Sequence, residues 1–120
     1  MLANLDGNPD TDPDPTWRPL ISVNHAEYPS GHSFLSTAIV DVTARFFGTS
    51  KITWTLTANR AAAPMIVKTE RTYTDLNSLL NEVTEARIWA GLHYRRAMQD
   101  GSAIGRRVAA HVYDNFFRPL

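Results

Sequence analysis

The sequence predicts an all-α protein, a helical bundle, and two kinds of observation carry that prediction. Three segments place apolar residues at helical spacing, and glycines or polar capping residues stand at the ends of these segments. The chain has 120 residues, of which 43% are hydrophobic and 20% are charged. Such a length and composition are typical of one globular domain with a core of modest size.

Residues 1–28 are predicted to form an extended arm and loop rich in proline and aspartate. The stretch 6–16, "DGNPDTDPDPT", contains three prolines and four aspartates, and proline disfavours helix both at its own position and at the preceding one. We expect this arm to be anchored on the core by Trp17, Leu20, Ile21 and Tyr28. Residues 29–120 are predicted to form the helical domain.

The first helix is predicted in "SGHSFLSTAIVDVTARFFG", residues 30–48. Ser30 is a favourable N-cap, because its hydroxyl can accept a backbone N–H of the first turn, and Gly48 is a plausible C-terminal stop. The spacing of the apolar residues predicts an inward stripe made of Phe34, Ala38, Ile39, Val42 and Phe46.

Two further helices are predicted, with no sheet between them. Residues 49–73 contain β-branched and aromatic side chains, but short irregular or strand-like connections are expected there. Thr74 or Asp75 caps the second helix, which ends at Gly91. After a turn over 92–99, the third helix runs from near Gly101 to Phe117. The expected inward residues are Leu76, Leu79, Leu80, Val83 and Ala86 in the second helix, and Ile104, Val108, Ala109, Val112 and Phe116 in the third.

The charge balance and residue types exclude several functions. The formal net charge is zero, so no overall field attracts nucleic acid or an anionic membrane. The absence of cysteine excludes disulfides and thiolate sites. No apolar run approaches the ~20 residues that span a bilayer, and the N-terminus lacks the pattern of a signal peptide. We expect a soluble protein of unknown localisation.

Two local patterns have the chemistry of an oxyanion site. Ser30, Gly31 and His32 begin a helix, where unpartnered N–H groups and the helix dipole favour an anion. Arg87 offers a bidentate fork for an oxyanion, and the helix break at Gly91 allows His93 to turn toward the same pocket. A histidine there can act as a nucleophile or as a metal ligand.

Together, "HAEYPSGHS" and "ARIWAGLHYR" followed by "DGSAIGRRVA" resemble two signature motifs of the type 2 phosphatidic acid phosphatase and vanadium-dependent haloperoxidase superfamily, most of all its bacterial haloperoxidase-like branch. The resemblance covers about residues 17–113. It implies the C-terminal part of the acid phosphatase and haloperoxidase fold. It also implies that Ser30, Gly31 and Arg87 bind phosphate or vanadate, that His32 is the general acid–base group, and that His93 attacks phosphorus or binds vanadium.

The chain departs from the family pattern at several positions. The Lys-x6-Arg-Pro motif is absent, since Thr11 stands where Arg18-Pro19 would require lysine. Ala97 replaces an aspartate that orients the motif histidine in many members, and Asp100 is a possible substitute. Ala86 also replaces a serine. A lost oxyanion donor is worth about 2.7–4 kcal/mol, so we expect much reduced catalysis from this chain alone.

The predicted function is therefore that of a phosphatase or a vanadium haloperoxidase-like enzyme. Its substrate would be a small phosphate-containing molecule, or a halide with peroxide, and vanadate is the possible cofactor. We expect the chain to be a homo-oligomer or to lack an N-terminal half that supplies the missing motif. The alternative is a non-catalytic, oligomerising helical module that retains a relic oxyanion pocket.

Overall fold

The computed structural model describes residues 8–10, 12, 14–58 and 70–116. Helix α1 spans Gly31–Phe47, α2 spans Leu76–Trp89 and α3 spans Arg95–Asn115. Between α1 and α2 along the chain lie two short strands, β1 (Trp54–Thr57) and β2 (Glu70–Tyr73). The predicted all-α helical bundle is confirmed, and the small sheet is an addition to it. No described helix is both long enough and apolar enough to cross a membrane.

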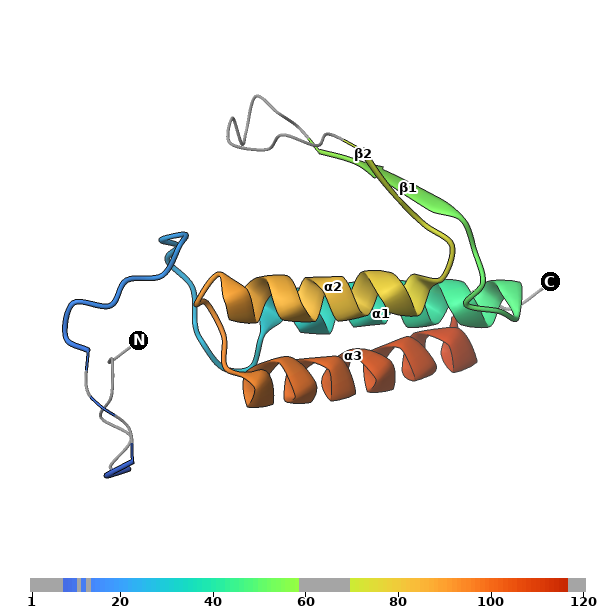
Figure 1. The fold of residues 1–120 in the computed structure, drawn as a ribbon. Helices are drawn as coiled ribbons and strands as arrows, with labels where there is room; N and C mark the ends of the chain where they lie inside the picture. Colours follow the sequence, from blue (N-terminus) through green and yellow to red (C-terminus); the bar gives the residue numbers. More distant parts are fainter. Residues whose placement is uncertain (1–7, 11, 13, 59–69, 117–120) are drawn as a thin grey trace.

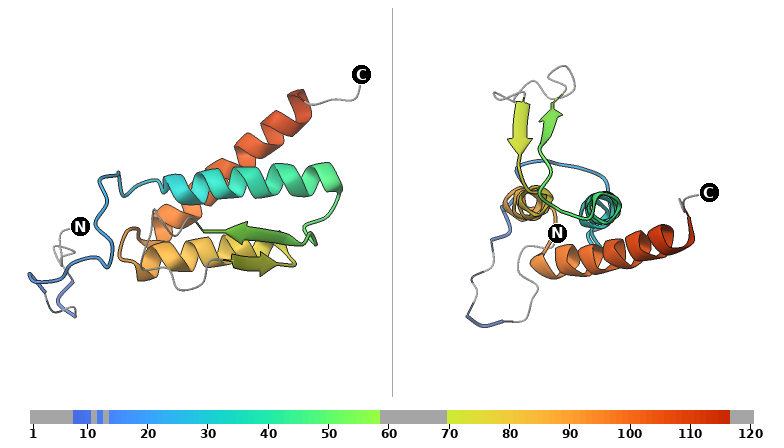
Figure 2. Two further views of the ribbon diagram at one scale, coloured as in Figure 1. Left: turned by 90° about the horizontal axis from the view of Figure 1, so that it is seen from above. Right: turned by 90° about the vertical axis from the view of Figure 1, so that its right-hand side faces the viewer.

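The three helices meet at one end of the bundle. Helices α1 and α3 both begin where α2 ends, and the N-terminal arm leaves the bundle at that same end (Figure 1). The turned views show α3 crossing α1 at a clear angle (Figure 2). Two backbone hydrogen bonds fasten this end, from the Ser30 N–H to the Ala97 carbonyl and from the Leu20 N–H to the Ala90 carbonyl, each 3.1 Å long.

The predicted helix ends of α1 and α2 are confirmed. The Ser30 hydroxyl accepts the Ser33 N–H, and Gly48 closes α1 in the left-handed conformation with φ 70°. Asp75, rather than Thr74, is the N-cap of α2, and its carboxylate accepts the Asn77 N–H.

The predicted inward stripe of α1 is wrong in part. Ile39 and Phe46 are 44% and 70% exposed, and the buried residues of the helix are instead Ser33, Thr37 and Val40. The reason lies in α3, which turns small residues toward α1 at every fourth position: Ala97, Gly101, Gly105 and Ala109. Because those residues let the two backbones approach closely, the contact face of α1 has room only for small side chains.

Hydrogen bonds replace apolar contact at this interface. The Ser33 hydroxyl donates to the Met98 carbonyl at 2.6 Å, and the Thr37 hydroxyl donates to the Ser102 hydroxyl at 3.1 Å. Each buried hydroxyl of α1 is thereby satisfied by α3, which removes the penalty of burying it.

The expected inward residues of α2 and α3 are also only partly correct. Leu76 is completely buried and Ala109 is 1% exposed, as expected. Ala86 is exposed. So are Ile104, Val108 and Phe116, with values of 39%, 38% and 56%. These side chains extend an apolar surface that the described part of the chain leaves uncovered.

Helix α3 and the arm also differ from expectation. The third helix begins at Arg95, so only residues 92–94 form the turn that was predicted over 92–99. Gly101, near which the helix was predicted to begin, lies inside α3 instead, and close packing against Ser30 and Ser33 requires a residue without a side chain there. In the arm, Trp17, Leu20, Ile21 and Tyr28 are all exposed, although a Trp17 ring edge lies against Gly91. Thr11 and Phe117 lie outside the described residues.

A two-stranded antiparallel sheet stands where none was predicted. Trp54 pairs with Tyr73 and Thr57 pairs with Glu70, as suits β-branched and aromatic residues. Tyr73 is buried, and Arg71 forms a 2.8 Å ion pair with Glu82 of α2. The hairpin is therefore fixed to α2, on the side of the bundle away from α3 (Figure 1).

Candidate oxyanion-binding site

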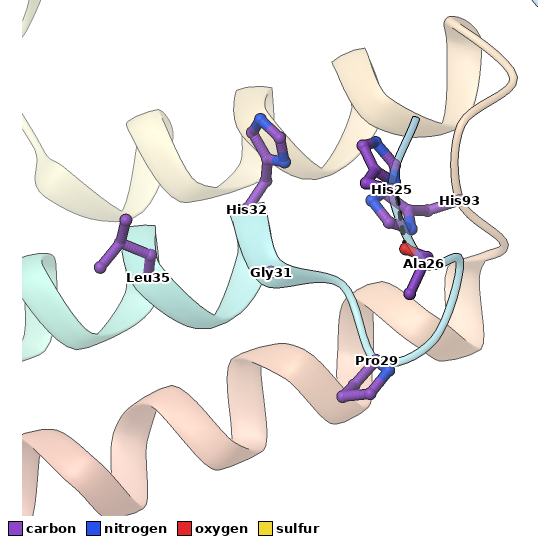
Figure 3. A pocket seen from close by; sticks show the side chains of 7 residues that line it. All are labelled: His25, Ala26, Pro29, Gly31, His32, Leu35 and His93. Carbon is purple, nitrogen blue, oxygen red and sulfur yellow. Dashed lines mark hydrogen bonds between the residues drawn. The ribbon is translucent and has the colours of Figure 1, made fainter. Parts of the chain in front are cut away.

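A pocket of about 390 Å³ opens at the end of the bundle where α1 begins. Its volume is many times the ~30 Å³ that one water occupies, so it has room for a tetrahedral oxyanion. Figure 3 shows how the loop before α1, the first turns of α1 and the turn after α2 each contribute to the wall. The lining residues are His25, Ala26, Pro29, Gly31, His32, Leu35 and His93.

His93 has a fixed orientation and one free ring nitrogen. The residue is 3% exposed, and its Nδ1 lies 2.6 Å from the backbone carbonyl of Glu27. A carbonyl only accepts, so Nδ1 carries the proton and the neutral ring has its lone pair on Nε2. That Nε2 is buried and has no hydrogen-bond partner among the described residues. A buried polar atom without a partner is costly, so this nitrogen is a position for a water or a ligand atom.

Arg87 approaches the pocket from the last turn of α2. Its Nη2 donates to Nε2 of His25 at 2.8 Å, and its Nε is buried without a partner in the described part of the chain. The His25 ring is stacked on His93, with ring centres 4.8 Å apart and planes 11° from parallel. Arg87 does not itself line the pocket, since the His25 side chain stands between its guanidinium and the pocket.

The start of α1 supplies the remaining groups. His32 lies in the first turn, is exposed to the pocket and has its ring centre 6.5 Å from that of His93. Ser30 takes the N–H groups of Ser33 and Phe34. The N–H groups of Gly31 and His32 then have no acceptor within the helix. Ser30 itself is fully buried and does not line the pocket.

The electrostatics of the pocket favour an anion. Burial, and next the positive charge of Arg87, hold the pKa of His32 below its usual value. Burial also lowers the pKa of His93 and that of Arg87. Each of these groups disfavours its own positive charge in this setting, and a bound anion would relieve that cost for all of them.

The structure thus brings together Gly31, His32, His93 and, behind His25, Arg87, while Ser30 serves as the helix cap. The suggestion that Asp100 orients His93 is wrong. Asp100 accepts from Tyr28 and Arg96 instead, because it lies one turn along α3 while the His93 Nδ1 already has the Glu27 carbonyl.

Sequence reasoning missed two residues of the site, His25 and Glu27. Besides accepting from His93, Glu27 uses its carboxylate to accept the Tyr94 N–H at 2.9 Å, at the start of α3. His25 lies seven positions before His32, within the same quoted stretch. The short distance along the chain between His25 and His32 was the only sequence signal that could have identified His25. Arg18, in contrast, donates to the Pro15 and Trp17 carbonyls of its own loop.

Comparisons with known proteins identify the family and the fold. A search of curated protein sequences found no significant match. Among solved structures, a bacterial vanadium-dependent iodoperoxidase is similar with a TM-score of 0.68 and 25% identity, over 83% of this chain and 23% of that one. Apo and holo forms of a bacterial vanadium-dependent chloroperoxidase have TM-scores of 0.64 and 0.65 and identities of 18% and 19%, each over 82% of this chain and 23% of theirs. At those identities the chloroperoxidases show the fold alone.

The chain therefore spans about a quarter of the length of the haloperoxidases that it resembles. The family model described as the VCPO second helical-bundle domain matches residues 3–120, which is almost the whole chain. The predicted resemblance to the haloperoxidase superfamily is confirmed, and the chain belongs to the family of VCPO second helical-bundle domains.

Proposed function

We propose that this chain is the oxyanion-binding part of a vanadium-dependent haloperoxidase, and that its pocket binds vanadate. One observation carries the proposal. The His93 Nε2 is a buried lone pair without a partner, on a ring whose orientation the Glu27 carbonyl fixes. An imidazole nitrogen in that state is suited to bind a metal centre, because the hydrogen bond on the other nitrogen sets both its tautomer and its direction.

The residues present fit vanadate in kind. His93 would hold the vanadium through Nε2, and the N–H groups of Gly31 and His32 would donate to its oxygens. Arg87 would turn its fork, including the unpartnered Nε, from His25 toward the anion. His32 would exchange a proton at the open side of the pocket. When bound, vanadate supplies the Lewis acidity that activates peroxide for halide oxidation.

A phosphatase would use the same residues, with the His93 Nε2 as the nucleophile toward phosphorus. Membership in the family of VCPO second helical-bundle domains favours the vanadate proposal, and so does the match to the bacterial iodoperoxidase structure. Phosphate is then a competitor for the same pocket rather than the substrate.

The full activity requires more than the described residues. The Lys-x6-Arg-Pro motif is incomplete, because Thr11 stands at the lysine position before Arg18-Pro19, and Arg18 donates to carbonyls of its own loop. We propose that further helices, from a second copy or from another part of a longer protein, cover the exposed apolar surface and complete the donor set. Exposed side chains such as Leu35, Ile39 and Phe46 provide the apolar area for that contact.

The test is a vanadate titration of the chain, followed by ⁵¹V NMR and by calorimetry. We expect saturable binding that Arg87→Ala weakens by about ten- to a hundredfold, because a charged hydrogen bond is worth about 1.5–3 kcal/mol. His93→Gln should remove binding at vanadium. His111→Ala is the matched control, since His111 lies near the other end of α3 and contacts Asn115.

Two results would overturn the proposal. The first is the absence of saturable vanadate binding, and the second is binding with the same affinity in the Arg87→Ala variant. If vanadate binds, bromination with peroxide and hydrolysis of p-nitrophenyl phosphate can be compared directly. Hydrolysis without bromination would assign the site to the phosphatase instead.

A further inference from the structure

The pocket contains a second arrangement of ligand atoms, in which His25, which has no contact with the anion in the proposed oxyanion site, joins His32 and His93. His25, His32 and His93 each offer one ring nitrogen, and the three nitrogens lie within 4.8 Å of one another. We propose that these three histidines form a binding site for a divalent transition-metal cation such as Zn²⁺, which competes with the oxyanion for the His93 Nε2. This proposal can be tested separately from the vanadate proposal, because it requires His25 as a ligand and predicts the opposite effect for the removal of Arg87.

The hydrogen bonds of the rings support this assignment. His93 directs Nδ1 at the Glu27 carbonyl, at 2.6 Å, and His25 directs Nδ1 at the Ala26 carbonyl, at 3.0 Å. Both rings therefore carry the proton on Nδ1 and have the lone pair on Nε2. Metal-binding histidines almost always donate their second ring nitrogen to a carbonyl, a carboxylate or a water in this way.

The separations of the nitrogens suit a zinc-like ion. Ligands bound tetrahedrally at about 2.0–2.1 Å stand about 3.3 Å apart. The three nitrogens must therefore move together by about 1.5 Å or less. His93 is buried and fixed, whereas His25 and His32 are exposed. His25 must also leave its contact with Arg87 and turn out of its stack on His93, so that both ring planes can point at one ion. The fourth position would be left for water, because no other side chain that lines the described pocket carries a ligand atom.

The ligand type selects the class of cation. Three imidazoles suit Zn²⁺, Cu²⁺ and Ni²⁺, whereas Mg²⁺ and Ca²⁺ require oxygen ligands. No carboxylate is among the residues that line the described pocket. A cation of the first kind would satisfy the buried His93 Nε2, which has no partner among the described side chains.

Arg87 determines which of the two ligands the pocket prefers. Its Nη2 occupies the lone pair of the His25 Nε2 at 2.8 Å, so a cation must displace it from that atom. The guanidinium also repels a cation and attracts an oxyanion. Removal of Arg87 should therefore strengthen cation binding and weaken oxyanion binding, so that one substitution changes the two affinities in opposite directions.

The experiment is a calorimetric titration of the chain with Zn²⁺ in a non-chelating buffer, with Co²⁺ as a spectroscopic probe of the ligand set. We expect saturable binding with one ion per chain. His25→Ala and His32→Ala should each weaken it by roughly tenfold or more, and both residues are exposed, so neither variant should disturb the fold. Arg87→Ala should bind Zn²⁺ several-fold more tightly, and His111→Ala should leave the affinity unchanged.

The outcomes separate this proposal from that of vanadate binding. No saturable Zn²⁺ binding, or binding that is unaffected by His25→Ala, would overturn the cation site and leave the oxyanion site standing. Weaker Zn²⁺ binding in Arg87→Ala would overturn the assignment of the His25 Nε2 as the shared atom. Zn²⁺ binding with all of the expected effects, but without vanadate binding, would leave only the cation site.

Discussion

Gly105→Ala tests whether close backbone packing holds α1 against α3. An added Cβ at position 105 would lie 2.4 Å from the Phe34 carbonyl oxygen and 2.9 Å from the Thr37 Cβ. An ordinary contact begins at 3.4 Å, so the helices must separate by about 1 Å. The obstacle is a backbone carbonyl inside a helix, which cannot swing away as a flexible side chain can.

The expected net effect is a loss of stability, and its size follows from opposing contributions. Replacing glycine by alanine inside a helix is favourable by about 1 kcal/mol, while overpacking a close interface costs about 1–3 kcal/mol. Separation also stretches the buried hydrogen bonds of Ser33 and Thr37 to α3, each worth about 1 kcal/mol. We therefore expect Gly105→Ala to destabilise the chain by about 2 kcal/mol.

The assay is urea unfolding followed by circular dichroism, at one fixed protein concentration because association would shift the midpoint. Ala103→Gly is the control, since Ala103 is exposed on the same helix and should lose only the propensity difference of about 1 kcal/mol. A Gly105→Ala variant as stable as the parent chain, or more stable, would refute close packing as the basis of this interface.

Three further predictions use the same unfolding assay. Ser33→Ala should cost about 1 kcal/mol because the buried bond to the Met98 carbonyl is lost, and an unchanged midpoint would contradict that bond. Gly91→Ala should cost about 1–2 kcal/mol since φ is +74° there, and full stability would mean that the turn adjusts freely. The folded pKa values of His32 and His93 lie below 6.5, so the unfolded chain binds more protons as the pH falls through 6.5. Stability should therefore decrease on acidification in this range, and a flat profile would argue against both shifts.

Local rules predicted the helix ends well, because they depend on short segments. Ser30, Gly48, Asp75 and Gly91 each act through their own backbone conformation or through a partner within a few residues. The face that each helix buries depends instead on its neighbour. Small residues recur at every fourth position of α3, at Ala97, Gly101, Gly105 and Ala109. They form a contact face only because a second helix, α1, packs closely against the two glycines.

The residues of the site could likewise be predicted from the sequence only in part. Motif spacing identified Arg87 and His93, although six residues would separate them by about 240° on a continuous helix, because Gly91 breaks the helix between them. Spacing could not identify Glu27, whose carbonyl contacts a histidine 66 positions away. Only the folded chain shows that the loop before α1 orients the turn after α2.

Glu27 links the loop before α1 both to the start of α3 and to the histidine of the candidate site. Its carbonyl fixes His93, and its carboxylate accepts an N–H at the start of α3. The loop that holds Glu27 also carries His25, which accepts from Arg87. One loop therefore sets both the free ring nitrogen and the direction of the guanidinium, the two features on which both binding proposals rest. This arrangement explains why the site lies where α1 begins and α2 ends, since no other end of the described bundle brings that loop against both helices.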